Sequence, residues 1–315
     1  MPNELWRLSA AQLVAGYQAG DFSPVEVLAA CQARMAATQP TINAFVHVDH
    51  AGAQAAAQAS AQRWARGEPL GSLDGVPVSL KDNLHAQGLP TSWGSLLTGG
   101  FVPAQDELPV ARLRAAGAVI LGKTNLSEWA NFRSLKSSSG WSGRGGQTRN
   151  PYILDRNPCG SSSGSGSAIA ANLAAIAVGT ETDGSIICPS ATCGIVGIKP
   201  TLGLVSHSGI IPIAHSQDTA GPMTRTVADA AAMLNVLAAP DPNDEITIVR
   251  GKIKALDYRT SLKKDGLKGM RIGVVRQYFG RNAKVDKLIE PQLQVLKDGG
   301  AALVDVTFPK LQDFG

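Results

Sequence analysis

The stretch that most constrains the fold of this chain runs from Asn157 to Ile186, where turns of small residues flank an apolar segment. Every position from 160 to 167 is Gly or Ser, and a second turn rich in small residues covers 180–185. Small residues let the backbone approach a ligand closely and expose its N–H groups. A flexible linker would not contain the Ala-rich apolar run 168–178. The pattern predicts two facing turns joined by one compact apolar element, and a site made of hydroxyls and backbone donors.

The size and composition of the chain favour a tightly packed α/β protein. It has 315 residues, 44% hydrophobic composition, 34 glycines and 5% aromatic residues, enough for a large core with many turns. The formal net charge is only +4 and no block of Lys and Arg occurs, so a nucleic-acid partner is not indicated. No apolar run approaches the roughly 20 residues that span a bilayer, so we expect no membrane partner.

The four cysteines and the N-terminus bear on the compartment. Cys31, Cys159, Cys188 and Cys193 fit no zinc-binding spacing. The opening MPNELWRLSAAQL lacks the basic start and apolar core of a signal peptide. We therefore expect reduced thiols in a cytoplasmic protein. The alternative is a secreted or periplasmic protein whose leader is missing from this sequence.

Hydrophobic periodicity and cap signals predict alternating helices and strands. Ser23-Pro24-Val25-Glu26 is a capping box with Pro at the first helical position, and Thr226 caps a later helix. Helices are predicted over 5–19, 23–38, 51–66, 107–116, 126–132, 227–237 and 285–297. Strands are predicted over 43–48, 76–80, 118–121, 194–198, 270–275 and 302–306. A polar loop is expected over 134–157 and a surface excursion over 241–265. The expected fold is a single α/β domain over residues 1–315, a twisted mixed β-sheet covered on both faces by helices.

A charged residue follows the apolar strand predicted over 76–80. Lys81 begins the sequence Lys81-Asp82-Asn83 at the carboxyl end of that strand. Ligands in α/β sheets gather beyond the carboxyl ends of strands, so Lys81 is a candidate functional residue. The alternative is an ordinary strand-end lysine paired with Asp82.

Three other kinds of site are weakly supported. Residues 160–164 match the G-x-S-x-G nucleophile elbow, but that elbow follows a strand and residues 150–159 are polar with two prolines. Only Glu181 or Asp183 with His207 or His215 keeps the required order of acid and histidine. A phosphate-binding loop would need a Gly-Lys-Ser/Thr ending, which is lacking. No His/Asp/Glu cluster has metal-ligand spacing, so no metal is expected.

Hydroxyl chemistry with a lysine base remains. A serine needs a base to become nucleophilic, and a lysine can serve only when it is neutral. Lowering a lysine pKa from its reference of about 10.4 to near 7 requires about 4 kcal/mol, which burial and nearby positive charge can supply. Composition alone does not select the lysine or the serine.

Three segments together resemble the amidase signature family. They are Gly75-Val-Pro-Val-Ser-Leu-Lys81-Asp-Asn83, the Ser-rich run Gly160 to Ser167, and Gly179-Thr-Glu-Thr-Asp-Gly-Ser185-Ile186. Segments 88–91, 122–125 and 221–225 fit the same family, and the resemblance covers nearly the whole chain. Segments 127–133, 141–147 and 158–166 are most similar to bacterial peptide amidases, which hydrolyse C-terminal amides of peptides.

The resemblance implies a role for each matching residue. Ser185 matches the nucleophile, Ser161 the bridging serine that follows a cis peptide bond, and Lys81 the base. The separation of 24 residues (185 − 161) agrees with the family and selects Ser161 from the serine triplet. The implied oxyanion hole consists of the backbone N–H groups of Thr182, Asp183, Gly184 and Ser185. No cofactor or metal is implied.

Two departures from the family pattern qualify these expectations. The family often has Gly-Gly-Ser-Ile-Arg at the nucleophile, whereas this chain has Asp183-Gly184-Ser185-Ile186-Ile187 and lacks that cation. Family members usually continue well past the length of this chain, so truncation at the C-terminal end is expected. We expect an amidase that acts on a small amide or peptide amide and forms an acyl-enzyme on Ser185. The alternatives are the glutamine-hydrolysing subunit of a tRNA-dependent amidotransferase and a non-catalytic binding fragment; the oligomeric state stays open.

Overall fold

The computed structural model describes residues 2–134, 136–250 and 257–309. These residues divide after Tyr258 into two compact units, and each is described by itself. The larger unit holds all the candidate site residues. The expected domain boundary of 1–315 stays a prediction.

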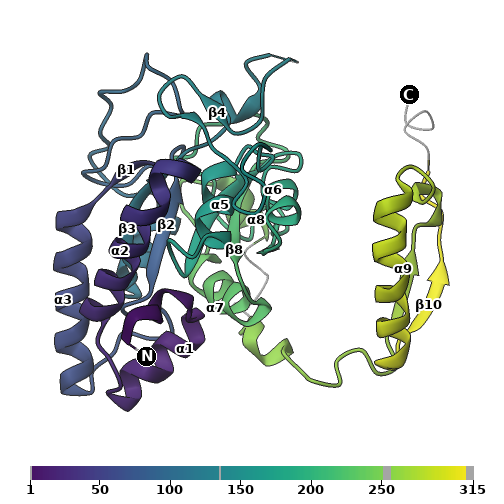
Figure 1. Ribbon diagram of the computed structural model, residues 1–315, viewed down its shortest axis with the longest axis horizontal. Helices are drawn as coiled ribbons and strands as arrows, with labels where there is room; N and C mark the ends of the chain where they lie inside the picture. The colour runs from purple at the N-terminus through teal and green to yellow at the C-terminus, as the bar shows by residue number, and fades with distance from the viewer. Residues whose placement is uncertain (1, 135, 251–256, 310–315) are drawn as a thin grey trace. The chain divides into compact units, whose positions relative to one another are not determined.

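A six-stranded mixed sheet forms the centre of the first unit (Figure 1). The strands lie in the order β1 (Phe45–Val48), β3 (Val119–Thr124), β2 (Pro77–Lys81), β6 (Ile176–Glu181), β8 (Thr219–Thr224) and β7 (Val196–Gly197). Strand β2 is parallel to both β3 and β6, whereas the β1–β3, β6–β8 and β7–β8 pairs are antiparallel. The predicted α/β class with a mixed sheet is confirmed.

Helices cover both faces of this sheet, and each face has its own apolar cluster. Alternate residues of a strand point to opposite faces, so Ile120 belongs to one cluster and Val119 and Leu121 to the other. The first cluster contains residues of α1 (Ala10–Ala19), α4 (Leu108–Ala115) and α7 (Val227–Leu237). The second contains residues of α3 (His50–Arg66) and α5 (Ser163–Ala170), while α2 (Pro24–Ile42) contributes to both.

Two helix boundaries differ from the predictions because of local side-chain bonds. The expected helix over 5–19 is divided into η1 (Pro2–Arg7) and α1, since Ser9 is extended and forms a capping box with Gln12. The helix expected to end at 38 continues through Pro40 to Ile42. Its exit is held by the Gln39 side chain, whose Oε1 accepts from the N–H groups of residues 44 and 45 at 2.9 and 3.0 Å.

The apolar run 168–178 is not one element. Helix α5 ends at Ala170 and strand β6 begins at Ile176. Strand β8 was missed because Gly221 and Pro222 weaken its strand pattern. Gly221 is required there, since an added Cβ would lie 2.2 Å from the Ile198 carbonyl oxygen of the adjoining chain segment.

The connecting segments hold short elements that periodicity did not predict. The helix expected over 126–132 is a 3-10 turn, η2 (Glu128–Asn131), with left-handed φ at Trp129 and Ala130. The loop 134–157 includes a small hairpin of β4 (Trp141–Ser142) and β5 (Gly146–Gln147). Helix α6 (Ile187–Thr192) follows the turn that contains Ser185.

The excursion expected over 241–265 is only partly on the surface. Asp241, Asp244 and Thr247 are buried near the start of α8 (Glu245–Arg250). The short turn η3 (Tyr258–Ser261) comes later, and residues 251–256 lie outside the described residues.

The second unit is a β–α–β element. It contains β9 (Arg271–Val274), η4 (Arg276–Tyr278), α9 (Ala283–Asp298) and β10 (Ala302–Asp305), with β9 and β10 parallel. The strands and helix predicted there are confirmed within one or two residues. Among the helices in the described parts of both units, none is long and apolar enough to cross a membrane.

Candidate active site

Lys81 is the last residue of β2 and its side chain is fully buried. Its Nζ lies 2.7 Å from the Ser161 Oγ, 2.8 Å from the Thr180 Oγ1 and 3.2 Å from the Thr180 carbonyl oxygen. Asp82 is turned elsewhere, since its Oδ1 lies 3.5 Å from the Lys123 Nζ. The alternative of a Lys81–Asp82 pair is therefore wrong.

The environment of Lys81 favours its neutral form. Burial lowers the pKa of Lys81 to about 7, while the negative charges of Glu181 and Asp218 act in the opposite direction. Because the ammonium form loses its hydration shell in the interior, desolvation outweighs the attraction of the two carboxylates. A neutral amine has a free electron pair that can accept the hydroxyl proton of Ser161.

The serines around Ser161 have different partners. The Ser162 hydroxyl donates to the Thr180 carbonyl at 3.1 Å, and the Ser163 hydroxyl donates to the Cys159 carbonyl at 2.8 Å. Farther along α5, the Ser165 hydroxyl donates to a carbonyl of β6 at 3.2 Å. These bonds satisfy buried hydroxyls on backbone oxygens. The serine that contacts Lys81 is Ser161, and the Gly160–Ser161 peptide bond is cis.

Ser185 lies in the turn between β6 and α6, with 7% of its surface exposed. Its carbonyl oxygen accepts a hydrogen bond of 3.1 Å from the backbone N–H of Ser162. This bond joins the turn of Ser185 to the turn of Ser161, so the two turns predicted to face each other do so. The structure thus brings together all three candidate positions: Lys81 bonds to Ser161, and Ser185 lies against Ser162.

Backbone donors surround Ser185. Within the described ranges, no residue accepts a hydrogen bond from the N–H groups of Asp183, Gly184 or Ser185. Gly184 has a φ of 84°, which a residue with a side chain rarely adopts. Unpaired N–H groups in a turn can stabilise developing negative charge. Among the described residues the N–H of Thr182 has no acceptor either, and the Thr182 hydroxyl donates to Asp218.

Two carboxylates contact the turn that contains Ser185, Glu181 directly and Asp218 through the Thr182 hydroxyl, and periodicity did not identify either role. The Glu181 Oε2 accepts from the N–H groups of Ile186 and Ile187 at 2.7 and 2.8 Å. The Asp218 Oδ2 accepts from two further N–H groups, those of residues 213 and 214, at 2.8 and 3.0 Å. A sequence signal existed for Glu181, since it sits in the same small-residue turn as Ser185, but its acceptor role depends on how the turn folds.

A disulfide links the two turns. Cys159 and Cys188 form it with a Cα–Cα distance of 5.9 Å across a sequence separation of 29, a distance typical of disulfides. The expectation of reduced thiols is wrong for this pair, because the facing turns bring together cysteines far apart in sequence. Cys31 and Cys193 are free and buried.

The alternative of a nucleophile elbow activated by His207 or His215 is not supported, because the contacts of these two histidines do not include a serine hydroxyl. His207 Nδ1 lies 2.7 Å from Asp244 Oδ2, and His207 Nε2 lies 3.3 Å from His215 Nδ1. These contacts form a separate cluster of His207, His215 and Asp244. In the part of the chain that the structure describes, no group of three or more His, Cys, Asp or Glu side chains could hold a metal ion.

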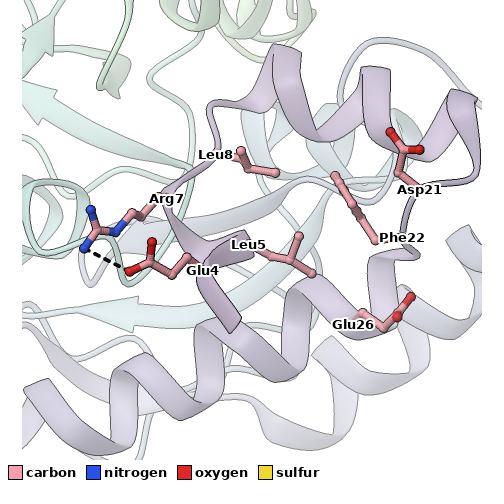
Figure 2. A pocket seen from close by; sticks show the side chains of 7 residues that line it. All are labelled: Glu4, Leu5, Arg7, Leu8, Asp21, Phe22 and Glu26. Carbon is pink, nitrogen blue, oxygen red and sulfur yellow. Dashed lines mark ion pairs between the residues drawn. The ribbon is translucent and has the colours of Figure 1, made fainter. Parts of the chain in front are cut away.

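A surface pocket of about 620 Å³ lies beside the N-terminal helices (Figure 2). Its apolar lining comprises Leu5, Leu8 and Phe22. Three of its four charged residues have partners: Glu4 pairs with Arg7 at 3.1 Å, and Glu26 accepts from the N–H of Ser23 in a helix cap. The fourth is Asp21. None of its lining residues belongs to the candidate site.

Comparison with known proteins identifies clear relatives. A family model described as Amidase matches residues 26–314. Native peptide amidase from Stenotrophomonas maltophilia is 47% identical with a TM-score of 0.93, over 98% of this chain and 63% of that one. An amidase family protein from Bacillus anthracis is 36% identical with a TM-score of 0.92, and the match covers 98% of this chain and 62% of that protein. One subunit of the glutamyl-tRNA(Gln) amidotransferase from Chloroflexus aurantiacus is 43% identical over 97% of this chain and 61% of its own length. The chain therefore spans about three fifths of these relatives.

Proposed function

Because this chain belongs to the amidase signature family, we propose that it hydrolyses amides through Ser185, Ser161 and Lys81. The observation that carries the proposal is the 2.7 Å contact between the buried Lys81 Nζ and the Ser161 Oγ. A lysine with a pKa of about 7 is partly neutral at physiological pH, and a neutral lysine can act as a general base.

The proposed reaction proceeds in two halves. Ser185 gives its proton to Ser161, Ser161 gives its own to the neutral Lys81, and the Ser185 oxygen attacks the amide carbonyl. The N–H groups of the 182–185 turn stabilise the resulting oxyanion. Lys81 then returns the proton to the leaving nitrogen, which departs as ammonia and leaves an ester on Ser185. Water then hydrolyses the ester, with Ser161 and Lys81 again transferring the protons. No step requires a metal or a cofactor.

Ammonia release from a peptide amide tests this proposal. The 315-residue chain is incubated with the amide, and ammonia is measured over time. We expect release that is lost in Ser185→Ala and reduced in Lys81→Ala and Ser161→Ala. Ser162→Ala is the matched control, since the hydroxyl of Ser162 bonds a backbone carbonyl instead of Lys81. Undiminished release by Ser185→Ala would refute the role of Ser185.

We propose C-terminal peptide amides as the substrate class. The 47% identity to a peptide amidase supports this choice, as does the similarity of segments 127–133, 141–147 and 158–166 to that group. Ile187 stands where the family often has Arg, so an acidic substrate gains no contact from a cation at that position. A panel of peptide amides, free glutamine and simple aliphatic amides would rank the substrates by kcat/KM, and a preference for glutamine would overturn the assignment.

The second candidate is the glutamine-hydrolysing subunit of a tRNA-dependent amidotransferase. It is favoured by the 43% identity to a protein of that class, a component of a glutamyl-tRNA(Gln) amidotransferase. This candidate predicts glutaminase activity and a stable partner protein that co-purifies with the chain. Glutaminase activity without activity on peptide amides would favour it.

A non-catalytic binding fragment is the third possibility, and covalent labelling distinguishes it. A fluorophosphonate probe reacts with activated serines, so the proposed enzyme should be labelled at Ser185. An unlabelled but folded chain would support the binding fragment. We propose no nucleic-acid or membrane partner.

The compartment is a separate prediction. The disulfide between Cys159 and Cys188 supports the secreted or periplasmic alternative over the cytoplasmic one, since disulfides persist in oxidising compartments. Fractionation of the source cells followed by thiol trapping would decide between them.

A further inference from the structure

The Cys159–Cys188 disulfide lies directly between the two turns of the candidate site. Cys159 precedes Ser161 by two residues (161 − 159), and Cys188 follows Ser185 by three (188 − 185). The turns are also joined by the 3.1 Å hydrogen bond from the Ser162 N–H to the Ser185 carbonyl. The disulfide is thus a covalent link between the proposed relay serine and the proposed nucleophile.

Each cysteine is anchored in the turn it serves. Cys159 has a left-handed φ of 62°, rare for a residue with a side chain, and its carbonyl accepts from the Ser163 hydroxyl at 2.8 Å. The N–H of Cys188 donates to the Gly184 carbonyl at 2.7 Å, which closes the turn that contains Ser185. A displacement of either sulfur atom should therefore also move the backbone that positions the hydroxyls of Ser161 and Ser185.

The disulfide is accessible, whereas the other thiols are not. Cys159 and Cys188 are each partly exposed, so both residues lie where a small thiol can approach them. Cys31 and Cys193 are buried, and burial raises their pKa to about 12 and about 11. Their thiolate forms, which carry out exchange, are therefore scarce.

We propose that the Cys159–Cys188 disulfide is a redox-sensitive clamp: the intact bond fixes the position of Ser161 relative to Ser185, and its reduction lowers the catalytic rate. The proposal rests on the proposed amide hydrolysis. The cysteines act as positioning residues, because their sulfur atoms hold the turns and do not contact the substrate.

The chemistry of release is a thiol–disulfide exchange with a small dithiol. A thiolate of the dithiol attacks one sulfur, forms a mixed disulfide and expels the other cysteine as a thiolate. The second thiol of the reagent then displaces the remaining cysteine and closes a cyclic disulfide. Two electrons pass to the protein, which gains two thiols after protonation, and the reagent is oxidised by the same two electrons.

Activity before and after reduction is the first test. The wild-type chain is assayed with a peptide amide in the oxidised state, after dithiothreitol, and after reoxidation with diamide. We expect reduction to lower kcat by about tenfold to a hundredfold, because small misplacements of reacting groups are costly. KM should change by less than about twofold, and reoxidation should restore kcat. An unchanged kcat in a chain shown by alkylation and mass to carry four free thiols would overturn the proposal.

Controls separate the clamp from other effects of the reductant. The double variant Cys159→Ser/Cys188→Ser should have the low kcat of the reduced protein and no response to dithiothreitol. The Cys31→Ala variant keeps both bridge cysteines and should respond like wild type. If the double variant does not fold, the reduction and reoxidation of the wild-type chain still decide the question.

A readout independent of activity separates this proposal from the proposed function. Amide hydrogen exchange is followed in peptides covering 159–166 and 182–188, and in a peptide of α3 as reference. Reduction should accelerate exchange in the two turns and leave α3 unchanged. Absence of that acceleration overturns the clamp even if the chain is an amidase. A chain without activity in any state refutes the proposed function, and with it the rate control, whatever the exchange shows.

Discussion

At the scale of single residues, the central group is the ammonium or amine of Lys81. Its carbon stem and its nitrogen are both buried, and its three polar contacts are to two hydroxyls and one carbonyl. None of these contacts carries a full negative charge. Glu181 and Asp218 act only through space, so desolvation outweighs them and the pKa of Lys81 falls to about 7.

The pH–rate profile follows from the pKa of Lys81. The proposed base, Lys81, must be neutral to accept a proton, so kcat/KM for ammonia release should rise about tenfold per pH unit below pH 7 and level off above it. Measurements from pH 5 to 9 check this rise. A profile that is flat across pH 7, or one that falls with rising pH, would contradict a neutral Lys81 as the base.

Replacing Glu181 by Gln should shift this profile to lower pH. The Glu181 carboxylate raises the pKa of Lys81, so removing its charge makes Lys81 lose its proton at lower pH. Gln keeps an oxygen that can accept from the N–H of Ile186, as Glu181 does at 2.7 Å. The profile of Glu181→Gln is compared with that of Glu68→Gln, an exposed change far along the chain. A shift toward higher pH would show that the Glu181 charge does not act on Lys81 as described.

At the scale of elements, the packing of α5 sets the position of Ser161. This helix begins at Ser163 and all but one of its residues are buried. Its glycines permit close approach: a Cβ on Gly164 would lie 2.2 Å from the Ala44 carbonyl oxygen and 2.6 Å from the Asn125 backbone. These neighbours are backbone atoms that cannot rotate away. The Gly/Ser composition of the run therefore reflects close helix packing as well as chemistry.

The substitution Gly164→Ala should destabilise the fold. Overpacking costs about 1–3 kcal/mol, more than the roughly 1 kcal/mol that Ala gains over Gly in a helix. Gly166→Ala is the matched control, because its Cβ would be no closer than 3.2 Å to Pro189, and we expect it to be near neutral. Urea unfolding of both variants measures the difference. Equal stability of the two would argue against the close packing of α5.

The cap at Ser9 explains why the first predicted helix is divided, and it is testable. The Ser9 hydroxyl accepts from the Gln12 N–H at 3.2 Å. Ser9→Ala should lower the free energy of unfolding by about 0.5–2 kcal/mol, as expected for a lost N-cap. Ser9→Asp retains an acceptor and should be close to wild type in thermal unfolding. If Ser9→Ala were as stable as Ser9→Asp, the cap would not be what ends the first helical segment.

At the scale of the whole molecule, the order of strands in the sheet decides which distant residues come into contact. Strand β6 lies next to β2 although 94 residues separate the end of β2 from the start of β6 (Ile176 minus Lys81, less one). This adjacency brings Thr180 within 2.8 Å of the Lys81 Nζ. It also aligns the following turn with α5, so that the disulfide can close a loop 29 residues long.

Reduction of this disulfide should lower global stability as well as local order. Closing a loop of 29 residues restricts the unfolded chain and contributes about 3–4 kcal/mol in the loop-entropy account. Urea unfolding with and without dithiothreitol measures the loss, and the Cys159→Ser/Cys188→Ser variant should show no effect of the reductant. A stability unchanged by reduction in the wild type would show that native-state effects cancel the entropy.

Local sequence determined much of this protein by itself. The helix over 227–237 and its cap at Thr226 are as predicted, and so is the helix from about 51 to 66. Caps and periodicity depend on residues only three or four positions apart, so the chain alone specifies them. The roles expected for Lys81, Ser161 and Ser185 came from matching whole segments to a family, since no local rule selects one serine from a triplet.

Tertiary structure decided the features that depend on distant residues. Strand β8 carries Gly221 and Pro222, and its pairing with β6 makes it a strand where the local pattern is weak. The Cys159–Cys188 bond, and the contacts of Glu181 and Asp218 with the turn that contains Ser185, exist because the fold brings these residues together. The lowered pKa of Lys81 is of the same kind. From the sequence alone, a lysine at the end of a strand is expected to have its ordinary pKa. Only burial against α5 and β6 removes the water that stabilises its charged form.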